Sequence, residues 1–406
     1  MDPLGYRWAA SGAMALTGRA EGPPLGAPSG LVELMDRATA LLRHHTGGQL
    51  NLDGLALLGE RAALEGWQRR SPDSCGGGTR LLPAADGWVA VARSRPDDVA
   101  AFPAWLELDD TPLQTWSDLG RAVSTRTMHD LDIRAALLGL PIAAMASVRP
   151  PRHLTFGLPI GRQVVDSPKK ITPTIADLVV VDLSSLWAGP LCGALLSQAG
   201  ADVIKVESAS RPDGARRGNS TFFDLLNGAK RSVIIDLNRP DGTNQLRQLL
   251  QHADIVIESA RPRGLEQMGI VALELLSADS GPKVWVSITS HGRGPEARER
   301  VGFGDVAAVG GGLVAFDQLG PVFVADAVTD PLAGLVAAAA TLEALALPEP
   351  CLLDVAMAYL AAHTTGPLLE VGGLRAEPPR ARAATRAAPP LGADTAAVLK
   401  TLTLTL

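Results

Sequence analysis

Asp326 is the residue whose type and surroundings most favour chemistry. It follows the apolar residues 321–325 and lies four residues before the dipeptide Asp330-Pro331. An aspartate before a proline is typical of a helix start, so capping explains Asp330. The Asp326 carboxylate instead follows an apolar segment that would partly remove it from water. Acids in such surroundings concentrate at functional sites, and an ordinary loop carboxylate is the competing interpretation.

Three consecutive glycines, Gly76, Gly77 and Gly78, are the second candidate for chemistry. Glycines in a row make a mobile loop whose backbone can approach a ligand, although a plain hairpin turn explains them equally well. The three cysteines are too few and too scattered for a zinc site or a disulfide framework, and the histidines show no metal spacing. We therefore expect a reducing environment and no metal.

Strands and helices that alternate in the middle of the chain must position these residues. Short apolar runs predict strands at 178–183, 203–207, 232–237, 254–258 and 284–288. This alternation predicts an α/β fold with a doubly wound parallel sheet. Ligands of such sheets bind beyond the carboxyl ends of the strands. The glycine fingerprint of dinucleotide enzymes is missing after the first strand, which disfavours a nicotinamide dehydrogenase.

Bulk composition and segment boundaries limit the remaining possibilities. The 406 residues favour two or three domains, and a net charge of −6 argues against nucleic-acid binding. The N-terminus lacks the features of a signal peptide, and the apolar run at 332–347 is too short for a membrane span, so we expect a soluble cytoplasmic protein. The expected units are residues 1–150 (helical segment, glycine-rich loop and small α+β domain), 151–173 (linker), 174–366 (Rossmann-like domain with Asp326) and 367–406 (C-terminal tail).

Five motifs in the middle of the chain form an ordered set that resembles the class III CoA transferases of the CaiB/BaiF type, which include the formyl-CoA transferases. The motifs are residues 180–190 (VVDLSSLWAGP), 200–207 (GADVIKVE), 227–232 (NGAKRS), 253–258 (ADIVIE) and Arg261-Pro262. The resemblance implies a Rossmann-like sheet with a second, smaller α+β domain, in interlocked chains that form a homodimer or hetero-oligomer. It also implies coenzyme A as substrate and a transfer of CoA from an acyl-CoA to a carboxylic acid.

The resemblance assigns roles to individual residues. Asp326 would be the nucleophile that forms an aspartyl anhydride and then an aspartyl-CoA thioester, under a lid formed by Gly76, Gly77 and Gly78. Lys230 would meet a phosphate, and Phe303 would lie near the acyl group. The implied CoA-binding residues are Trp187, Ala188, Leu226, Asn227, Lys230, Ser259, Ala260, Arg261 and Phe303.

The segments follow one another in an unusual order. The glycine loop and residues 86–90 match family elements that normally follow the Rossmann-like part, yet here they precede it. A weak internal repeat relates residues 30–53 to residues 334–354, and the first copy has Pro23, Pro24 and Ala27 where the second has the Asp326 segment. The chain thus resembles a permuted or partly duplicated transferase, whose site is completed either within one chain or between two.

Two other functions stay open. An α-methylacyl-CoA racemase needs an acid/base pair, but residues 301–305 lack the histidine that relatives carry there, and His291, the nearest alternative, is expected to cap a loop. A non-catalytic CoA-binding or partner subunit would explain the rearranged order without chemistry at Asp326.

Overall fold

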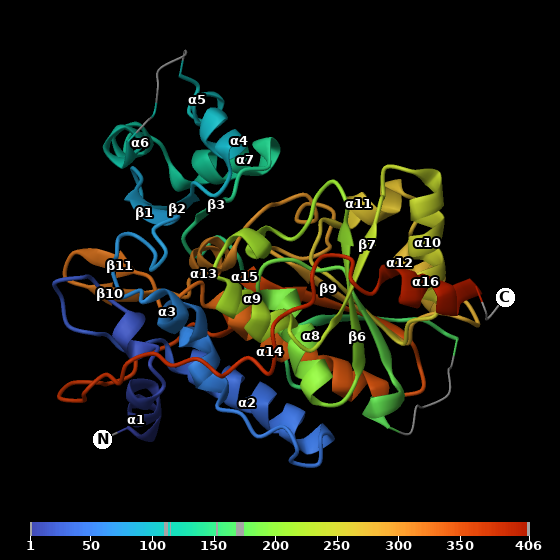
Figure 1. Cartoon of the computed structure of the whole chain (residues 1–406). Helices are drawn as coiled ribbons and strands as arrows, with labels where there is room; N and C mark the ends of the chain where they lie inside the picture. Colours follow the sequence, from blue (N-terminus) through green and yellow to red (C-terminus); the bar gives the residue numbers. More distant parts are fainter. Residues whose placement is uncertain (1, 109–112, 114, 152, 168–173, 404–406) are drawn as a thin grey trace.

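The computed structural model describes residues 2–108, 113, 115–151, 153–167 and 174–403. Its strands form a seven-stranded sheet, a three-stranded sheet and a two-stranded hairpin, and helices surround them (Figure 1). No helix in these ranges is long and apolar enough to cross a membrane.

The seven-stranded sheet has the order β4-β12-β9-β8-β5-β6-β7. All neighbouring pairs are parallel except β4 and β12. The chain runs outward from β5 through β6 to β7, then returns to β8 and continues through β9 to β12, so the strand order reverses between β5 and β8. A crevice at this reversal is where doubly wound sheets bind ligands. The strands are β4 (Gly161–Val164), β5 (Val179–Asp182), β6 (Asp202–Ser208), β7 (Arg231–Ile235), β8 (Ile255–Glu258), β9 (Val284–Thr289) and β12 (Cys351–Ala356).

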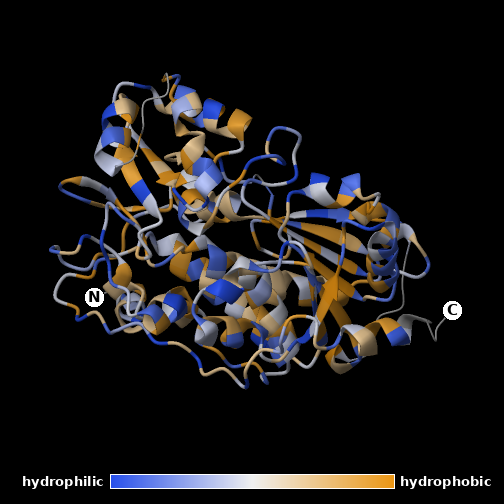
Figure 2. Cartoon of the chain, turned by 45° about the horizontal axis from the view of Figure 1, so that its top comes forward, coloured by the Kyte–Doolittle hydropathy of each residue, from blue (hydrophilic) through white to orange (hydrophobic). Residues whose placement is uncertain are grey.

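The predicted α/β fold class and all five predicted strands are confirmed. These strands are buried on both faces: Val180 packs into one apolar cluster and the next residue, Val181, into another. Figure 2 shows the strands as the most hydrophobic part of the molecule. Residues 161–164, within the segment expected to be a linker, form the edge strand β4, so part of that segment belongs to the sheet.

Helices cover both faces of the large sheet. One face carries α8 (Ala188–Gln198) and α14 (Thr329–Leu345), and α14 also packs against α2 (Ser29–His45). The other face carries α10 (Pro240–Gln251), α12 (Ala272–Ser277) and α16 (Thr395–Thr403). The remaining helices of this part are α9 (Ser220–Asn227), α11 (Pro262–Gln267), α13 (Gly304–Gly311) and α15 (Met357–His363).

The antiparallel sheet β1-β2-β3 forms a smaller unit with its own core, at the top of Figure 1. Helix α13 packs against β2 and β3 and so joins this unit to the large sheet. The elements are β1 (Thr79–Pro83), β2 (Trp88–Ala92), β3 (Ile142–Ala144), α4 (Pro96–Ala100), α5 (Phe102–Trp105), α6 (Trp116–Val123) and α7 (Met128–Leu138).

The segment between α15 and α16 contacts the N-terminal part of the chain near α1 (Pro3–Ala10) and α3 (Glu60–Glu65). The C-terminal tail runs back over the N-terminal segment, where Leu369 N donates to Ala27 O and Glu377 N donates to Ala9 O, both at 2.9 Å (Figure 1). Helices α2 and α14, the two copies of the predicted repeat, have 17 residues each and lie in contact. The likeness ends there, because residues 353–354 lie in β12 while residues 52–53 form no strand.

Candidate functional site

Asp326 lies in a loop between the hairpin strand β11 (Gly320–Val322), which pairs with β10 (Ala315–Asp317), and α14. Its side chain is fully buried, and its neighbours Ala325 and Ala327 have φ angles of 51° and 42°. Alanine rarely adopts this left-handed conformation, and such strain persists only where surrounding contacts impose it. Ala325 N donates to Thr17 Oγ1 at 3.0 Å. Ala327 N donates to Asp305 Oδ1 at 3.1 Å. Contacts from two distant segments therefore hold the loop that carries Asp326.

Arg61, on α3, forms a bidentate ion pair with Asp326. Its Nε lies 2.9 Å from Oδ2 and its Nη2 lies 2.8 Å from Oδ1. Its guanidinium group also stacks on two indole rings, 5.2 Å from the centroid of Trp67 and 4.7 Å from that of Trp187. Burial acts to lower the pKa of Arg61, but Asp326 raises it above its usual value, so the guanidinium stays charged. No local sequence pattern marks Arg61, because its partner is 265 residues away.

The charges of two more carboxylates, Asp305 and Asp330, act on the same guanidinium. Burial raises the pKa of Asp305 to about 6, and the charge of Asp326 adds to the effect. Burial also raises the pKa of Asp330 to about 7, against the opposing charge of Arg61. The prediction that Asp330 caps α14 is wrong: the helix begins at Thr329, and Asp330 Oδ2 lies against Gly304, where an added methyl group would come within 2.4 Å of it.

The glycine loop belongs to the same surroundings. Its preceding residue, Cys75, is buried, with Sγ 3.4 Å from the carbonyl oxygen of Ala325, next to Asp326. A methyl group at Gly76 would lie 2.9 Å from the ring of Trp67, the indole on which Arg61 stacks. Gly77 has a φ of 75°, which glycine adopts without strain. Gly76 and Gly78 are exposed, so Gly76, Gly77 and Gly78 form a solvent-facing loop beside the segment that carries Asp326 in the same chain.

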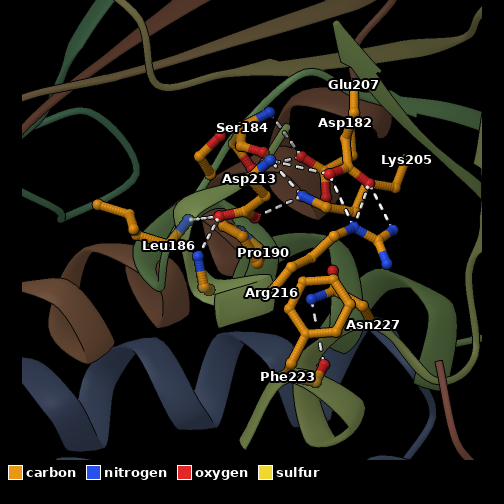
Figure 3. A network of polar contacts seen from close by, with 12 residues as sticks. Asp182, Ser184, Leu186, Pro190, Lys205, Glu207, Asp213, Arg216, Phe223 and Asn227 are labelled. Carbon is orange, nitrogen blue, oxygen red and sulfur yellow. Dashed lines mark hydrogen bonds and ion pairs between the residues drawn. The ribbon is translucent and has the colours of Figure 1, made fainter. Parts of the chain in front are cut away.

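A network of buried charges fixes the loop after β5, at the point where the strand order reverses (Figure 3). Lys205 Nζ donates to Ser184 O at 2.9 Å and pairs with Asp213 Oδ2 at 2.9 Å. Asp213 Oδ1 in turn accepts from Leu186 N at 3.0 Å. Leu186 has a φ of 71°, so this contact holds a strained residue directly before Trp187. The carboxyl end of the sheet thereby positions the indole that supports Arg61.

The predicted CoA-binding residues at this edge fall into two groups. Trp187 and Ala188 are buried, whereas Ala260 and Arg261 are exposed after β8. The two loops meet where Ser185 N donates to Ser259 Oγ at 3.1 Å. Phe303 lies apart from these residues: it is partly buried before α13 and packs on a small cluster that includes Ala143 of the smaller unit.

The remaining three predicted residues lie inside the molecule. Lys230 Nζ contacts Asp182 Oδ2 at 2.7 Å, Pro190 O at 2.9 Å and Asn227 Oδ1 at 3.0 Å. All three of its donors are thus used, and burial lowers the pKa of its ammonium group. The prediction that Lys230 meets a phosphate is therefore contradicted. Leu226 and Asn227 are equally buried, so none of the three borders an open nucleotide site.

His291, considered for racemase chemistry, lies buried after β9. Burial lowers its pKa to about 3, so the ring is neutral. Neither ring nitrogen has a hydrogen-bond partner among the described residues, so the expected capping role is not seen. A methyl group added at Gly302 or Gly310 would lie against its ring, and the charges of Arg300 and Asp132 act on its pKa in opposite directions.

Comparison with known proteins identifies relatives of the sheet-forming part. The chain is 33% identical over 179 residues to succinyl-CoA--D-citramalate CoA-transferase of Chloroflexus aurantiacus, covering 42% of this chain and 44% of the relative. It is 32% identical over 148 residues to succinate--glutarate CoA-transferase of Agrobacterium fabrum, covering 33% and 36%. A CaiB/BaiF family protein from Brucella suis is 29% identical, with 48% of this chain and 55% of that chain covered and a TM-score of 0.43. The chain spans less than half the length of these two curated relatives.

The sequence model of CoA-transferase family III matches residues 175–395, which is more than half of the 406 residues. This range holds the large sheet, apart from its edge strand, and Asp326. The chain therefore belongs to CoA-transferase family III.

Proposed function

We propose that this protein transfers CoA from an acyl-CoA to a carboxylic acid, with Asp326 as the covalent catalyst. The observation that carries the proposal is the Asp326 carboxylate itself, which is fully buried in a strained loop beside the glycine loop and the switch point of the sheet. Strain of this kind persists where function requires it. Membership of CoA-transferase family III, and relatives that are named as CoA-transferases, support the same reaction.

Carboxylate catalysis divides the transfer into two similar halves. Asp326 attacks the thioester carbonyl of the donor, which gives a mixed anhydride and CoA thiolate. The thiolate attacks the aspartyl carbonyl, releases the donor acid and leaves an aspartyl-CoA thioester. The acceptor acid then repeats these steps in reverse and restores the Asp326 carboxylate.

Water must be kept away from both intermediates, because hydrolysis would end the transfer. Gly76, Gly77 and Gly78 suit a lid, since they follow Cys75, which contacts Ala325 next to Asp326, and two of them are exposed. Their backbone N–H groups would donate to the oxyanion that develops during each attack.

The switch point of the sheet suits the CoA moiety. Trp187, Ala188, Ser259 and Ala260 would border it there, between the ends of β5 and β8. Arg261 is exposed at that edge and is a natural partner for a phosphate, in place of the fully engaged Lys230. Phe303 would border the acyl group. Leu226, Asn227 and Lys230 would act indirectly, from inside the molecule, by supporting the loop that carries Trp187.

The names of the relatives guide the choice of substrates. Succinyl-CoA, D-citramalate and glutarate occur in those names. A panel of short acyl-CoAs and short mono- and dicarboxylic acids is therefore the first to test.

The test is exchange of labelled CoA between an acyl-CoA and a free acid. Asp326→Ala should lower the exchange rate by a factor of about 10³ or more, as removal of a nucleophile does. Asp202→Asn is the matched control. Asp202 lies at the amino end of β6, at the opposite ends of the strands from the switch-point loops, so the variant should retain the wild-type rate. Mass detection of a CoA adduct on the Asp326 peptide would support the mechanism, and full exchange by Asp326→Ala would contradict it.

Two further measurements separate the alternatives from a transferase. A racemase would wash deuterium into the α-position of an acyl-CoA without an acceptor acid. A binding subunit would catalyse neither reaction but would still be stabilised thermally by CoA. Either outcome would replace the proposal.

A further inference from the structure

The ion pair between Arg61 and Asp326 engages the proposed nucleophile on both oxygens. The carboxylate is fully buried, and its two oxygens accept from Nε and Nη2 of one guanidinium at 2.9 and 2.8 Å. A carboxylate in this arrangement is oriented, but its charge is neutralised. The same fork of N–H groups would fit any other carboxylate of similar shape.

Arg61 is held by more than Asp326. Its guanidinium stacks on Trp67 and Trp187, and these rings would keep the fork in place when Asp326 loses its charge. The Trp187 side chain is buried, and its Nε1 has no acceptor among the described residues, which leaves a second donor beside the fork. The Arg61 side chain is 26% exposed and that of Asp326 is fully buried, so Arg61 is the member of the pair that borders solvent.

The covalent step proposed above removes the charge of Asp326. An aspartyl-CoA thioester is neutral, and it would leave the Arg61 guanidinium without its counter-charge in a largely buried place, which is unfavourable. Asp305 and Asp330 supply part of this counter-charge, because loss of the Asp326 charge lowers their pKa values, but among the described residues neither of them accepts a hydrogen bond from the Arg61 fork as Asp326 does. A new carboxylate beside Arg61 would restore the pairing at the stage when the acceptor acid is needed.

We infer that Arg61 is the carboxylate-binding residue for the acid substrates, and that it exchanges the Asp326 carboxylate for the substrate carboxylate when Asp326 becomes a thioester. This inference rests on the proposed function. In the second half-reaction, an oxygen of the bound acid attacks the aspartyl thioester carbon and forms a C–O bond. The C–S bond breaks, and CoA leaves as the thiolate. The thiolate then attacks the acyl carbonyl of the anhydride, and the released Asp326 carboxylate pairs again with Arg61.

A binding experiment tests the exchange without any catalysis. Asp326→Asn mimics the neutral, substituted aspartate, so it should bind succinate at least about tenfold more tightly than the wild type in a calorimetric titration, as one charge-assisted hydrogen bond requires. Asp326→Ala, a second route to a neutral residue, should show the same gain. The double variant Asp326→Asn/Arg61→Met should lose it.

Asp202→Asn is the matched control. Asp202 forms an ion pair with Arg231 that is also bidentate but is exposed and lies at the amino ends of β6 and β7. Freeing Arg231 should give no gain in succinate affinity over the wild type. Equal affinity in the wild type and in both Asp326 variants would overturn the inference, as would a gain that survives loss of Arg61.

A kinetic experiment separates binding from a purely structural role. Arg61→Met should still form the CoA adduct on Asp326 from an acyl-CoA alone, while the KM for the acceptor acid rises at least about tenfold. A fall in kcat with an unchanged KM would overturn the inference. Failure of the wild type to form an adduct with any acyl-CoA would instead overturn the proposed function, while the succinate titration would still decide whether Arg61 binds carboxylates.

Discussion

The charges of three carboxylates, Asp326, Asp305 and Asp330, act on the single guanidinium of Arg61. This excess of acidic groups decides how the residues of the site respond to pH. Asp326 takes both donors of the fork, so Asp305 and Asp330 are left with weaker partners in a buried setting. Burial raises the pKa of Asp330 to about 7, well above its value in an unfolded chain. Between these two pKa values Asp330 binds more protons in the folded protein than in the unfolded chain, so the contribution of Asp330 to the free energy of unfolding falls as pH rises.

Asp330→Asn tests this balance. The contribution of Asp330 to the wild-type free energy of unfolding should fall between about pH 4 and pH 7 and change no further above that range. The variant lacks this loss, so its stability relative to the wild type should rise by about 2–4 kcal/mol between pH 4.5 and pH 8. Urea unfolding at a series of pH values measures the difference.

Asp317→Asn is the control with the opposite sign. Despite partial burial, Arg19 keeps the pKa of Asp317 below its usual value, so this residue stabilises the fold at neutral pH and loses its effect as pH falls. The variant should therefore be less stable than the wild type at pH 7 and approach it in acid. A pH-independent difference for Asp330→Asn would contradict the assigned environment.

Residue types alone identified Asp326 but not the group that holds it. Asp326 could be found because an apolar segment and a helix start bracket it in the sequence. Arg61 could not, because a single arginine in a helix has no pattern that names a partner 265 residues away. Asp330 was misassigned for a related reason: the dipeptide Asp-Pro indicates a cap with Pro331 as the first helical residue, yet here the helix begins two residues earlier, at Thr329.

Among the elements, the strands were predictable wherever burial on two faces required a continuous apolar run. The edge strand β4 gives no such signal, because its residues Gly161–Val164 are mostly exposed and pair with β12 on one side only. The loop after β5 was recognised by its motif, but the network that shapes it was not. Its charges come from β5, from β6 and the segment after it, and from Lys230 just before β7, and only the folded sheet brings them into contact (Figure 3).

Lys230→Met tests whether that network is structural. The change leaves the Asp182 carboxylate buried without its main partner, so the free energy of unfolding should fall by about 3–5 kcal/mol. Adding Asp182→Asn removes the unpaired charge and should recover part of the loss. Urea unfolding measures the free energy of unfolding, and CoA titration measures the affinity for CoA separately.

Arg261→Met provides the contrasting variant for the same measurements. Arg261 is exposed, so its removal should change stability by no more than about 0.5 kcal/mol while weakening CoA binding. Unchanged stability with lost CoA affinity in Lys230→Met would instead restore Lys230 as a phosphate partner.

For the whole molecule, the rearranged segment order raised the question whether one chain completes the site. Arg61 and Gly76–Gly78 come from the N-terminal part and Asp326 from the C-terminal part, yet Arg61 contacts Asp326 and Cys75 contacts Ala325 within a single chain. The C-terminal tail reinforces this closure, because Arg382 forms a bidentate pair with Glu60, the residue before Arg61. Each chain should therefore carry a complete site, whatever its oligomeric state.

Mixing two impaired variants tests this closure, at an acceptor-acid concentration well below the KM of Arg61→Met. If Arg61→Met and Asp326→Ala chains carry different tags, are expressed together and are purified through both tags, any complex should exchange CoA no faster than Arg61→Met alone, because neither chain contains a complete site. A site shared between chains would predict about half of the wild-type activity per dimer, since one of two symmetric sites would hold both native residues. Wild-type chains paired with Asp326→Ala chains control for assembly and should show about half of the wild-type exchange rate under either arrangement.

If the two tags never copurify, the chain is a monomer, and exchange by the isolated wild-type monomer would establish a complete site in a single chain. Recovered activity in the mixed complex would show instead that Arg61 of one chain serves Asp326 of another.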